Sequence, residues 1–137
     1  MDRSDFQKLA EVRAREAQSL FEQEQYDGAY YLAGYAVECA LKACIAKTTK
    51  QYEFPDKNLA NKAFTHVLAN LVPLASLESE LESATKSNPD LGRNWNTAKD
   101  WSEEARYDRH ARQKAEDLLT AVLDSESGIL PWLRARW

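Results

Sequence analysis

The chain has 137 residues, a formal net charge of −4 and two cysteines. This length is typical of one domain, which we expect to span residues 1–137, and a chain of this size buries a core without disulfides or structural metal. The acidic balance excludes a protein that coats long nucleic acids through broad positive potential, although a local basic cluster can still hold one phosphate group.

The first segment predicts a helix from Ser4 to about Gln25, with Ser4 as its N-cap. Apolar residues recur there at helical spacing and form one stripe: Phe6, Leu9, Ala10, Ala17, Leu20 and Phe21. Only a short linker separates this helix from the next, so we expect the two to be antiparallel neighbours.

The stretch Tyr26–Lys47 predicts the central helix of the protein. It has no proline and is apolar nearly all round, with Asp27, Glu38 and Lys42 as interruptions before the terminal Lys47, and a helix of that kind is buried inside a protein. Gly34 in its interior costs about 1 kcal/mol relative to alanine, so we expect tight packing at that position. The longest uncharged run, residues 28–37, is about half of the roughly 20 residues that cross a bilayer, and we expect no membrane span.

The cysteines and the N-terminal residues favour a cytoplasmic protein. Cys39 and Cys44 lie five positions apart, which on one helix is about 7.5 Å of rise and too far for a disulfide. We expect both to be buried, reduced thiols. The N-terminal sequence MDRSDFQKL lacks the apolar core of a signal peptide.

Two shorter helices are expected in the middle of the chain. Residues 48–62 predict a polar loop. Residues 64–72 predict a short helix that Pro73 ends, because proline lacks the N–H group and clashes with the preceding turn. A further apolar stripe predicts a helix that ends at Asn88-Pro89. The members of this stripe are Leu74, Leu77, Leu81 and Ala84.

The last third of the chain is expected to hold one long helix. Residues 89–99 predict a loop or a single irregular turn, and Asp100 with Glu103 is a candidate capping box. The helix should begin within residues 101–108 and run to about Ser125. The C-terminal ILPWLRARW predicts one extra turn packed on the body.

Together these elements predict an all-α fold: an up-and-down helical bundle of four main helices plus short ones. No strand pattern or internal repeat is present in the sequence. Five aromatic residues supply more apolar surface than one small bundle readily buries, so we expect a homodimer with aromatic side chains at its interface; the alternative is that they complete the core. They are Tyr30, Tyr31, Tyr35, Trp95 and Trp101.

The sequence has no motif for a cofactor or metal site. It lacks a glycine-rich phosphate loop, an HExxH pattern, a four-cysteine pattern and a nucleophile elbow. Its two histidines, His66 and His110, have no metal-ligand spacing. We therefore expect no cofactor and no metal, and three features remain as candidates for chemistry.

The first candidate is RYDRH, residues 106–110. On a helix, Arg106 and His110 would share a face, with Arg109 beside them and Lys114 one turn further. A guanidinium that holds a phosphate, next to an imidazole that moves a proton, suits cleavage of RNA. The alternative is a solvated basic face near a helix start.

The other two candidates are Glu38 and His66. A buried carboxylate at Glu38 must be paired, either with Lys42 four positions on or with an arginine such as Arg106; the alternative is a catalytic acid. His66 opens a short helix on its own, and we expect it to be a satisfied structural residue.

Three blocks of the sequence resemble the HEPN (higher eukaryotes and prokaryotes nucleotide-binding) domain family. They are AYYLAGYAVECALKACI in the central helix, FTHVLANL downstream, and Trp101 followed by Ala105-Arg106-Tyr107. The resemblance covers about residues 6–124, and the central-helix block is the most specific. It implies an up-and-down helical bundle that is commonly a homodimer. It also implies an association with RNA, nucleotides or a small nucleotidyltransferase partner, and many members are ribonuclease toxins of toxin–antitoxin pairs.

The resemblance also implies roles for particular residues. Family ribonucleases carry an arginine and a histidine at the start of the last long helix, which implies Arg106 and His110 as a catalytic pair. Three residues separate the two, a shorter spacing than in those enzymes. Tyr107 stands where active members have a small polar residue, and the Arg-Tyr pair resembles members without demonstrated nuclease chemistry. In some toxin pairs the partner modifies a tyrosine at the position that Arg112 occupies here.

Two functions are therefore expected. The first is a dimeric module that associates with RNA or nucleotide through Arg106, Tyr107 and Arg109, partnered with a small nucleotidyltransferase in a toxin–antitoxin-type system. The alternative is a metal-independent endoribonuclease toxin that uses Arg106 and His110.

Overall fold

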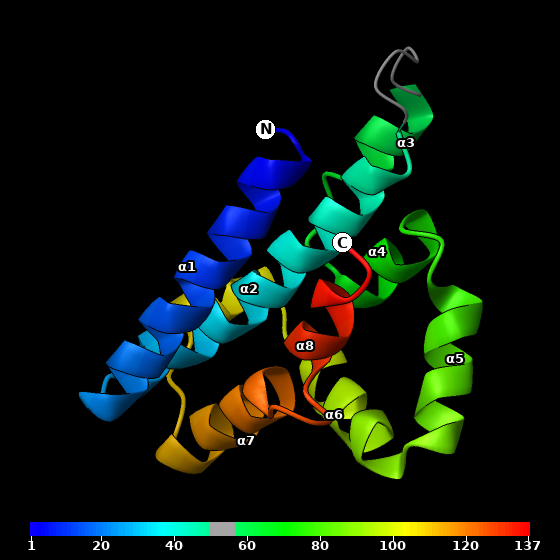
Figure 1. Ribbon diagram of the computed structural model, residues 1–137. Coiled ribbons are helices and arrows are strands. Elements are labelled where there is room, and N and C mark those ends of the chain that lie inside the picture. The colour runs from blue at the N-terminus through cyan, green and yellow to red at the C-terminus, as the bar shows by residue number, and fades with distance from the viewer. Residues whose placement is uncertain (50–56) are drawn as a thin grey trace.

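The computed structural model describes residues 1–49 and 57–137, and this part of the chain forms a bundle of helices (Figure 1). No strand occurs in these two ranges, so the predicted all-α fold is confirmed. The elements are α1 (Arg3–Glu22), α2 (Tyr26–Lys47), α3 (Lys57–Lys62), α4 (Leu68–Leu74), α5 (Glu78–Ser87), α6 (Pro89–Lys99), the 3₁₀ helix η1 (Glu103–Tyr107), α7 (Arg112–Leu123) and α8 (Ile129–Arg134).

Helix α2 lies at the centre of the bundle, with the bounds expected from the sequence. It packs against α1, α4, α7, α8 and η1, and Figure 1 shows α1 and α2 running antiparallel side by side. Because neighbours cover most of its sides, its buried residues do not form a single stripe. None of the described helices is both long enough and apolar enough to cross a bilayer.

The ring of Trp101 packs directly on Gly34 of α2. Trp101 follows α6 and is 2% exposed, and a Cβ atom added at Gly34 would lie 2.2 Å from its Cγ. Tyr31, one turn earlier on α2, stacks on the same indole with ring centroids 6.0 Å apart. Gly34 therefore provides the tight packing expected there, and its neighbour is an indole ring.

The start of α1 differs from the expectation. The N-cap is Asp2 rather than Ser4: the Asp2 carboxylate accepts a hydrogen bond from the Asp5 amide at 2.9 Å, and the Asp5 carboxylate accepts one from the Asp2 amide at 3.0 Å. This reciprocal pair is a capping box built from two aspartates. The helix also ends earlier than expected, at Glu22, and Glu24 then takes a positive φ of 61°.

Two expectations for the middle of the chain are wrong. Helix α3 occupies residues 57–62 of the predicted loop, and residues 50–56 of that loop lie outside the described residues. Helix α4 begins at Leu68 and continues through Pro73 instead of ending before it. The proline lies in the last turn, where the Ala75 amide still bonds to the Leu71 carbonyl at 3.0 Å, so the missing N–H does not end the helix.

The loop predicted for residues 89–99 is wrong, because this segment is helix α6. The Asn88 side chain accepts a hydrogen bond from the Leu91 amide at 3.2 Å, and Pro89 is the first helical residue. Asparagine at the N-cap and proline just inside the helix are both start signals. The dipeptide that ends α5 therefore also begins α6.

The prediction of a long helix that starts within residues 101–108 is also wrong. Asp100 is the C-cap of α6 and caps no following helix. Trp101 turns inward onto α2, the chain then forms η1, and α7 begins only at Arg112. The connection between them is fixed by the His110 amide, which donates a hydrogen bond to the Asp27 carboxylate at the start of α2.

The predicted C-terminal turn is helix α8. Its apolar residues Ile129, Leu130 and Leu133 are buried. The Arg134 guanidinium donates two hydrogen bonds, 2.6 and 2.8 Å long, to the Glu11 carboxylate of α1. Exposed ion pairs contribute about 1 kcal/mol or less to stability, so burial against α2, α6 and α7 holds α8 in place, and the ion pair adds one link to α1.

Gly34→Ala is expected to destabilise the protein, because the added methyl group overlaps the Trp101 ring in the core. Overpacking of this kind costs about 1–3 kcal/mol. Gly28→Ala is the matched control in the same helix: its Cβ atom would meet only the flexible end of Leu20, at 3.1 Å. Thermal unfolding followed by circular dichroism compares the two variants, and equal melting temperatures would contradict the importance of the Gly34 contact.

Candidate functional site

Exposed basic and aromatic side chains gather on η1 and on the residues that follow it. Arg106, Tyr107 and Arg109 are all exposed, and 76% of the Tyr107 surface is accessible. The guanidinium carbon of Arg106 lies 4.7 Å from the centroid of the Tyr107 ring. Arg109 forms no ion pair with any described residue. The segment therefore presents two cations and an aromatic face to solvent.

The positive charge of this surface is local. Residues 105–115 carry Arg106, Arg109, Arg112 and Lys114 against one acidic residue, Asp108, in a chain of net charge −4. Hydrogen bonding with Tyr107 is the main reason why the pKa of Arg106 lies above its ordinary value. The Arg106 charge is therefore present at any pH at which the protein would work.

Two of these cations lie over aromatic rings of the bundle. The ammonium of Lys114 is 5.2 Å from the centroid of Tyr30, and the guanidinium carbon of Arg112 is 5.9 Å from that of Phe21. A cation over a ring face is stabilised by the ring quadrupole. These two residues are therefore partly used in packing, which leaves Arg106 and Arg109 as the freer cations.

His110, in contrast, lies against the bundle. It is 8% exposed, and its ring stacks on Tyr30 with centroids 4.0 Å apart. Its Nε2 atom lies 3.1 Å from the carbonyl oxygen of Ala105, to which an N–H there donates, while Nδ1 is buried without a hydrogen-bond partner. Arg106 is exposed and shares no helix with His110, so the expected common helical face is wrong. The chemical role of the two residues stays a prediction.

Glu38 is a buried carboxylate with two partners. It is 1% exposed, its Oε2 atom lies 3.2 Å from Nζ of Lys42, and its Oε1 atom lies 2.8 Å from Nδ1 of His66. Of the two partners that the sequence left open, Lys42 is the one observed, and Arg106 is not bonded to this carboxylate. Pairing on both oxygens is what a buried charge requires.

His66 contacts a carboxylate through each of its ring nitrogens. Besides Glu38, it contacts Glu103 of η1, with 2.9 Å between Nε2 and the carboxylate oxygen. Sequence reasoning missed this contact because residues 66 and 103 are far apart and no short-range pattern joins them. The one available signal was the charge of Glu38 inside an apolar helix, which requires partners. In the described ranges, no group of three or more histidine, cysteine or acidic side chains is placed to hold a metal ion.

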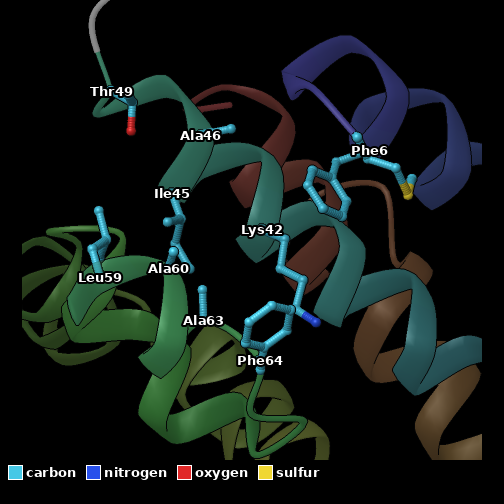
Figure 2. A pocket seen from close by; sticks show the side chains of 10 residues that line it. Phe6, Lys42, Ile45, Ala46, Thr49, Leu59, Ala60, Ala63 and Phe64 are labelled. Atoms are coloured by element: carbon cyan, nitrogen blue, oxygen red, sulfur yellow. The ribbon is translucent and has the colours of Figure 1, made fainter. Parts of the chain in front are cut away.

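An apolar pocket of about 380 Å³ opens beside α1, α2 and α3 (Figure 2). Ile45 and Leu59 line it, together with Phe64, which is 75% exposed. Lys42 also lines the pocket, and its ammonium is already bonded to Glu38. Ligand sites usually combine apolar walls with a few free polar groups that orient the ligand, so this pocket is a weaker candidate than the η1 surface.

The two cysteines are buried and free, as expected. Burial raises the pKa of the Cys39 thiol to about 12 and that of the Cys44 thiol to about 11. A thiol must lose its proton before it acts as a nucleophile or a metal ligand. Neither cysteine is therefore a reactive group at neutral pH.

The sequence was compared with curated proteins, solved structures and models of protein families. No curated protein and no solved structure matches it. A family model described as the HEPN domain matches residues 4–129, a range that includes the central helix, the exposed surface of η1 and the whole of α7. The chain therefore belongs to the HEPN domain family.

Proposed function

We propose that the protein is a single-domain HEPN module, residues 1–137, that binds single-stranded RNA or nucleotide through Arg106, Tyr107 and Arg109. The observation that carries the proposal is the exposure of Tyr107, 76% accessible, with the Arg106 guanidinium beside its ring. Aromatic side chains are costly to leave in water, and a ring flanked by arginines offers a face for a base and charges for its phosphates.

The form of this surface favours a single strand over a duplex. A duplex keeps its bases stacked inside, whereas unpaired bases can stack on aromatic side chains. The net charge of −4 gives no broad positive field along which a long duplex would lie. A short stretch of RNA, or one nucleotide, matches the few cations on η1 and after it.

We further propose that the module acts in the cytoplasm as a homodimer. Of the five aromatic residues expected to be in excess, Tyr30 and Trp101 are buried within their own chain, but Tyr31, Tyr35 and Trp95 are only half-buried. Tyr31 and Tyr35 stack on one another along α2 with centroids 6.0 Å apart. Aromatic side chains are enriched at protein interfaces, which supports a second copy as their cover.

The proposed dimer is expected to show twice the mass of the chain in light scattering at micromolar concentrations. Tyr35→Arg should lower that mass, because it places a charge among the half-buried rings of α2. Circular dichroism of the variant checks that its fold is intact. A single-chain mass for the wild type at every concentration would contradict the dimer.

Family membership also supports a working partner. We propose a small nucleotidyltransferase, in a toxin–antitoxin-type pair, as the protein with which this module acts. Co-expression of the two from neighbouring reading frames, followed by purification of the HEPN protein, tests the association. Absence of a nucleotidyltransferase gene beside this one, and of any co-purified protein, would remove this part of the proposal.

The second candidate function is a metal-independent endoribonuclease. Arg106 would hold the scissile phosphate, and His110 would transfer a proton during attack by the RNA 2′-hydroxyl. The observation in its favour is that Nδ1 of His110 has no hydrogen-bond partner. The observation against it is the stacking of that ring on Tyr30, which the histidine would have to leave to reach RNA.

Binding is tested with a short fluorescein-labelled single-stranded RNA and fluorescence anisotropy. Stacking of one base contributes about 1–3 kcal/mol, so Tyr107→Ala is expected to weaken affinity about tenfold or more. Arg106→Ala should weaken affinity and also make it less sensitive to salt. Arg93→Ala is the control, an exposed arginine on α6 that pairs with Asp90. Equal affinities for all four proteins would contradict the proposed site.

Cleavage is tested by incubating the protein with mixed RNA in EDTA. The binding module is expected to leave the RNA intact even when protein is in excess. General acid–base catalysis contributes about 10²–10⁴-fold to a rate, so cleavage by wild type that is lost in both His110→Ala and Arg106→Ala would establish the nuclease instead. The same incubation with DNA, which lacks the 2′-hydroxyl, is the chemical control.

A further inference from the structure

The His66 ring bridges two carboxylates that belong to different elements. Nδ1 lies 2.8 Å from Glu38 of α2, and Nε2 lies 2.9 Å from Glu103 of η1. A carboxylate only accepts hydrogen bonds, so both contacts are hydrogen bonds only when each ring nitrogen carries a hydrogen. The ring therefore connects the central helix to the 3₁₀ helix.

We propose that His66 is a positioning residue: it fixes η1 on α2 and thereby holds Arg106 and Tyr107 in the orientation that binds RNA. The inference rests on the proposed function for its consequence in binding. Its structural part, the ordering of η1, stands on the two contacts alone.

The bridge has one rigid end and one adjustable end. The Glu38 side chain is 2% exposed and is also held by Lys42, whose own side chain is 15% exposed. The Glu103 side chain is 33% exposed and sits on a helix of five residues. Glu38 on α2 is therefore the fixed end of this contact, and η1 is the element whose position the contact determines.

Holding Glu103 also orients Arg106. Residues three apart in a 3₁₀ helix eclipse one another, so Glu103 and Arg106 lie on one face of η1. The helix itself is weakly held: Ser102 at its N-cap makes no capping hydrogen bond with its side chain. Elsewhere η1 is held through Ala105, which is 4% exposed and whose carbonyl oxygen lies 3.1 Å from Nε2 of His110, and the contact of His66 with Glu103 adds a hold on the first residue of η1.

A purely structural role would explain His66 as a partner for buried Glu38 and nothing more. Two substitutions separate this from positioning. The amide of His66→Asn occupies the place of Nδ1, so it can donate to Glu38 but cannot reach Glu103. The longer His66→Gln places its amide near Nε2, so it can donate to Glu103 and leaves Glu38 with Lys42 alone.

The test measures three quantities on the full chain: melting temperature, hydrogen exchange of the Ala105 and Asp108 amides, and affinity for the labelled single-stranded RNA. Those amides bond to the carbonyls of Ser102 and Ala105 at 3.0 and 3.2 Å. His66→Asn is expected to keep the melting temperature, to speed exchange in η1 and to weaken binding about tenfold, the effect of one lost hydrogen bond to a charged group. His66→Gln is expected to lower the melting temperature and to keep wild-type affinity.

The outcomes separate the two proposals. Wild-type exchange and wild-type affinity in His66→Asn would overturn the positioning role, while a loss of affinity in Tyr107→Ala would leave the binding site standing. Unchanged affinity in Tyr107→Ala would remove the proposed function, and faster exchange of the Ala105 and Asp108 amides in His66→Asn would still support the positioning role. A loss of stability in His66→Gln alone, with wild-type exchange of the Ala105 and Asp108 amides and wild-type affinity in both variants, would show a partner for Glu38 only.

Discussion

The contact of the Trp101 indole with Gly34 sets the position of everything that follows α6. The ring replaces the side chain that α2 lacks at that point, so the chain must turn inward directly after Asp100. Where the sequence predicts the start of a long helix, the chain forms only the short η1, and α7 begins later at Arg112. The exposed residues Arg106 and Tyr107 owe their place at the surface to a buried tryptophan a few positions earlier.

A chain of alternating charges supports the same region from the other side. It runs from Lys42 through Glu38 and His66 to Glu103 and is neutral when the histidine is charged. Buried ion pairs seldom add net stability, because desolvation of the charges offsets their attraction. They instead favour one orientation of η1: apolar contacts would let η1 rotate over α2, whereas the contact between His66 and the Glu103 carboxylate opposes that rotation. Packing thus sets how close η1 lies, and the charges set how it is turned.

The sequence predicted the elements whose signals are local, and it failed where distant residues decide. The bounds of α2 followed from an apolar pattern that covers the whole helix. Asn88-Pro89 carried a clear signal that was assigned to the end of α5 alone, although it also starts α6. No local signal marked η1, because the turn before it depends on the distant Gly34. The capping box predicted at Asp100 does not form, because burial of Trp101 turns the chain inward directly after Asp100. The contact of His66 with Glu103 joins residues from different parts of the chain, so no pattern of spacing could reveal it.

The small residues of α2 restrict where this protein can be altered. Ala33, Ala36 and Ala40 are at most 1% exposed, so a larger side chain at any of them would have to displace a neighbouring helix. The exposed positions of η1 have no such limit, since Tyr107 and Arg106 face solvent. Protein engineers who wish to change what this molecule recognises therefore have freedom on η1 and in the first turn of α7, and almost none along the helix that makes its sequence most recognisable.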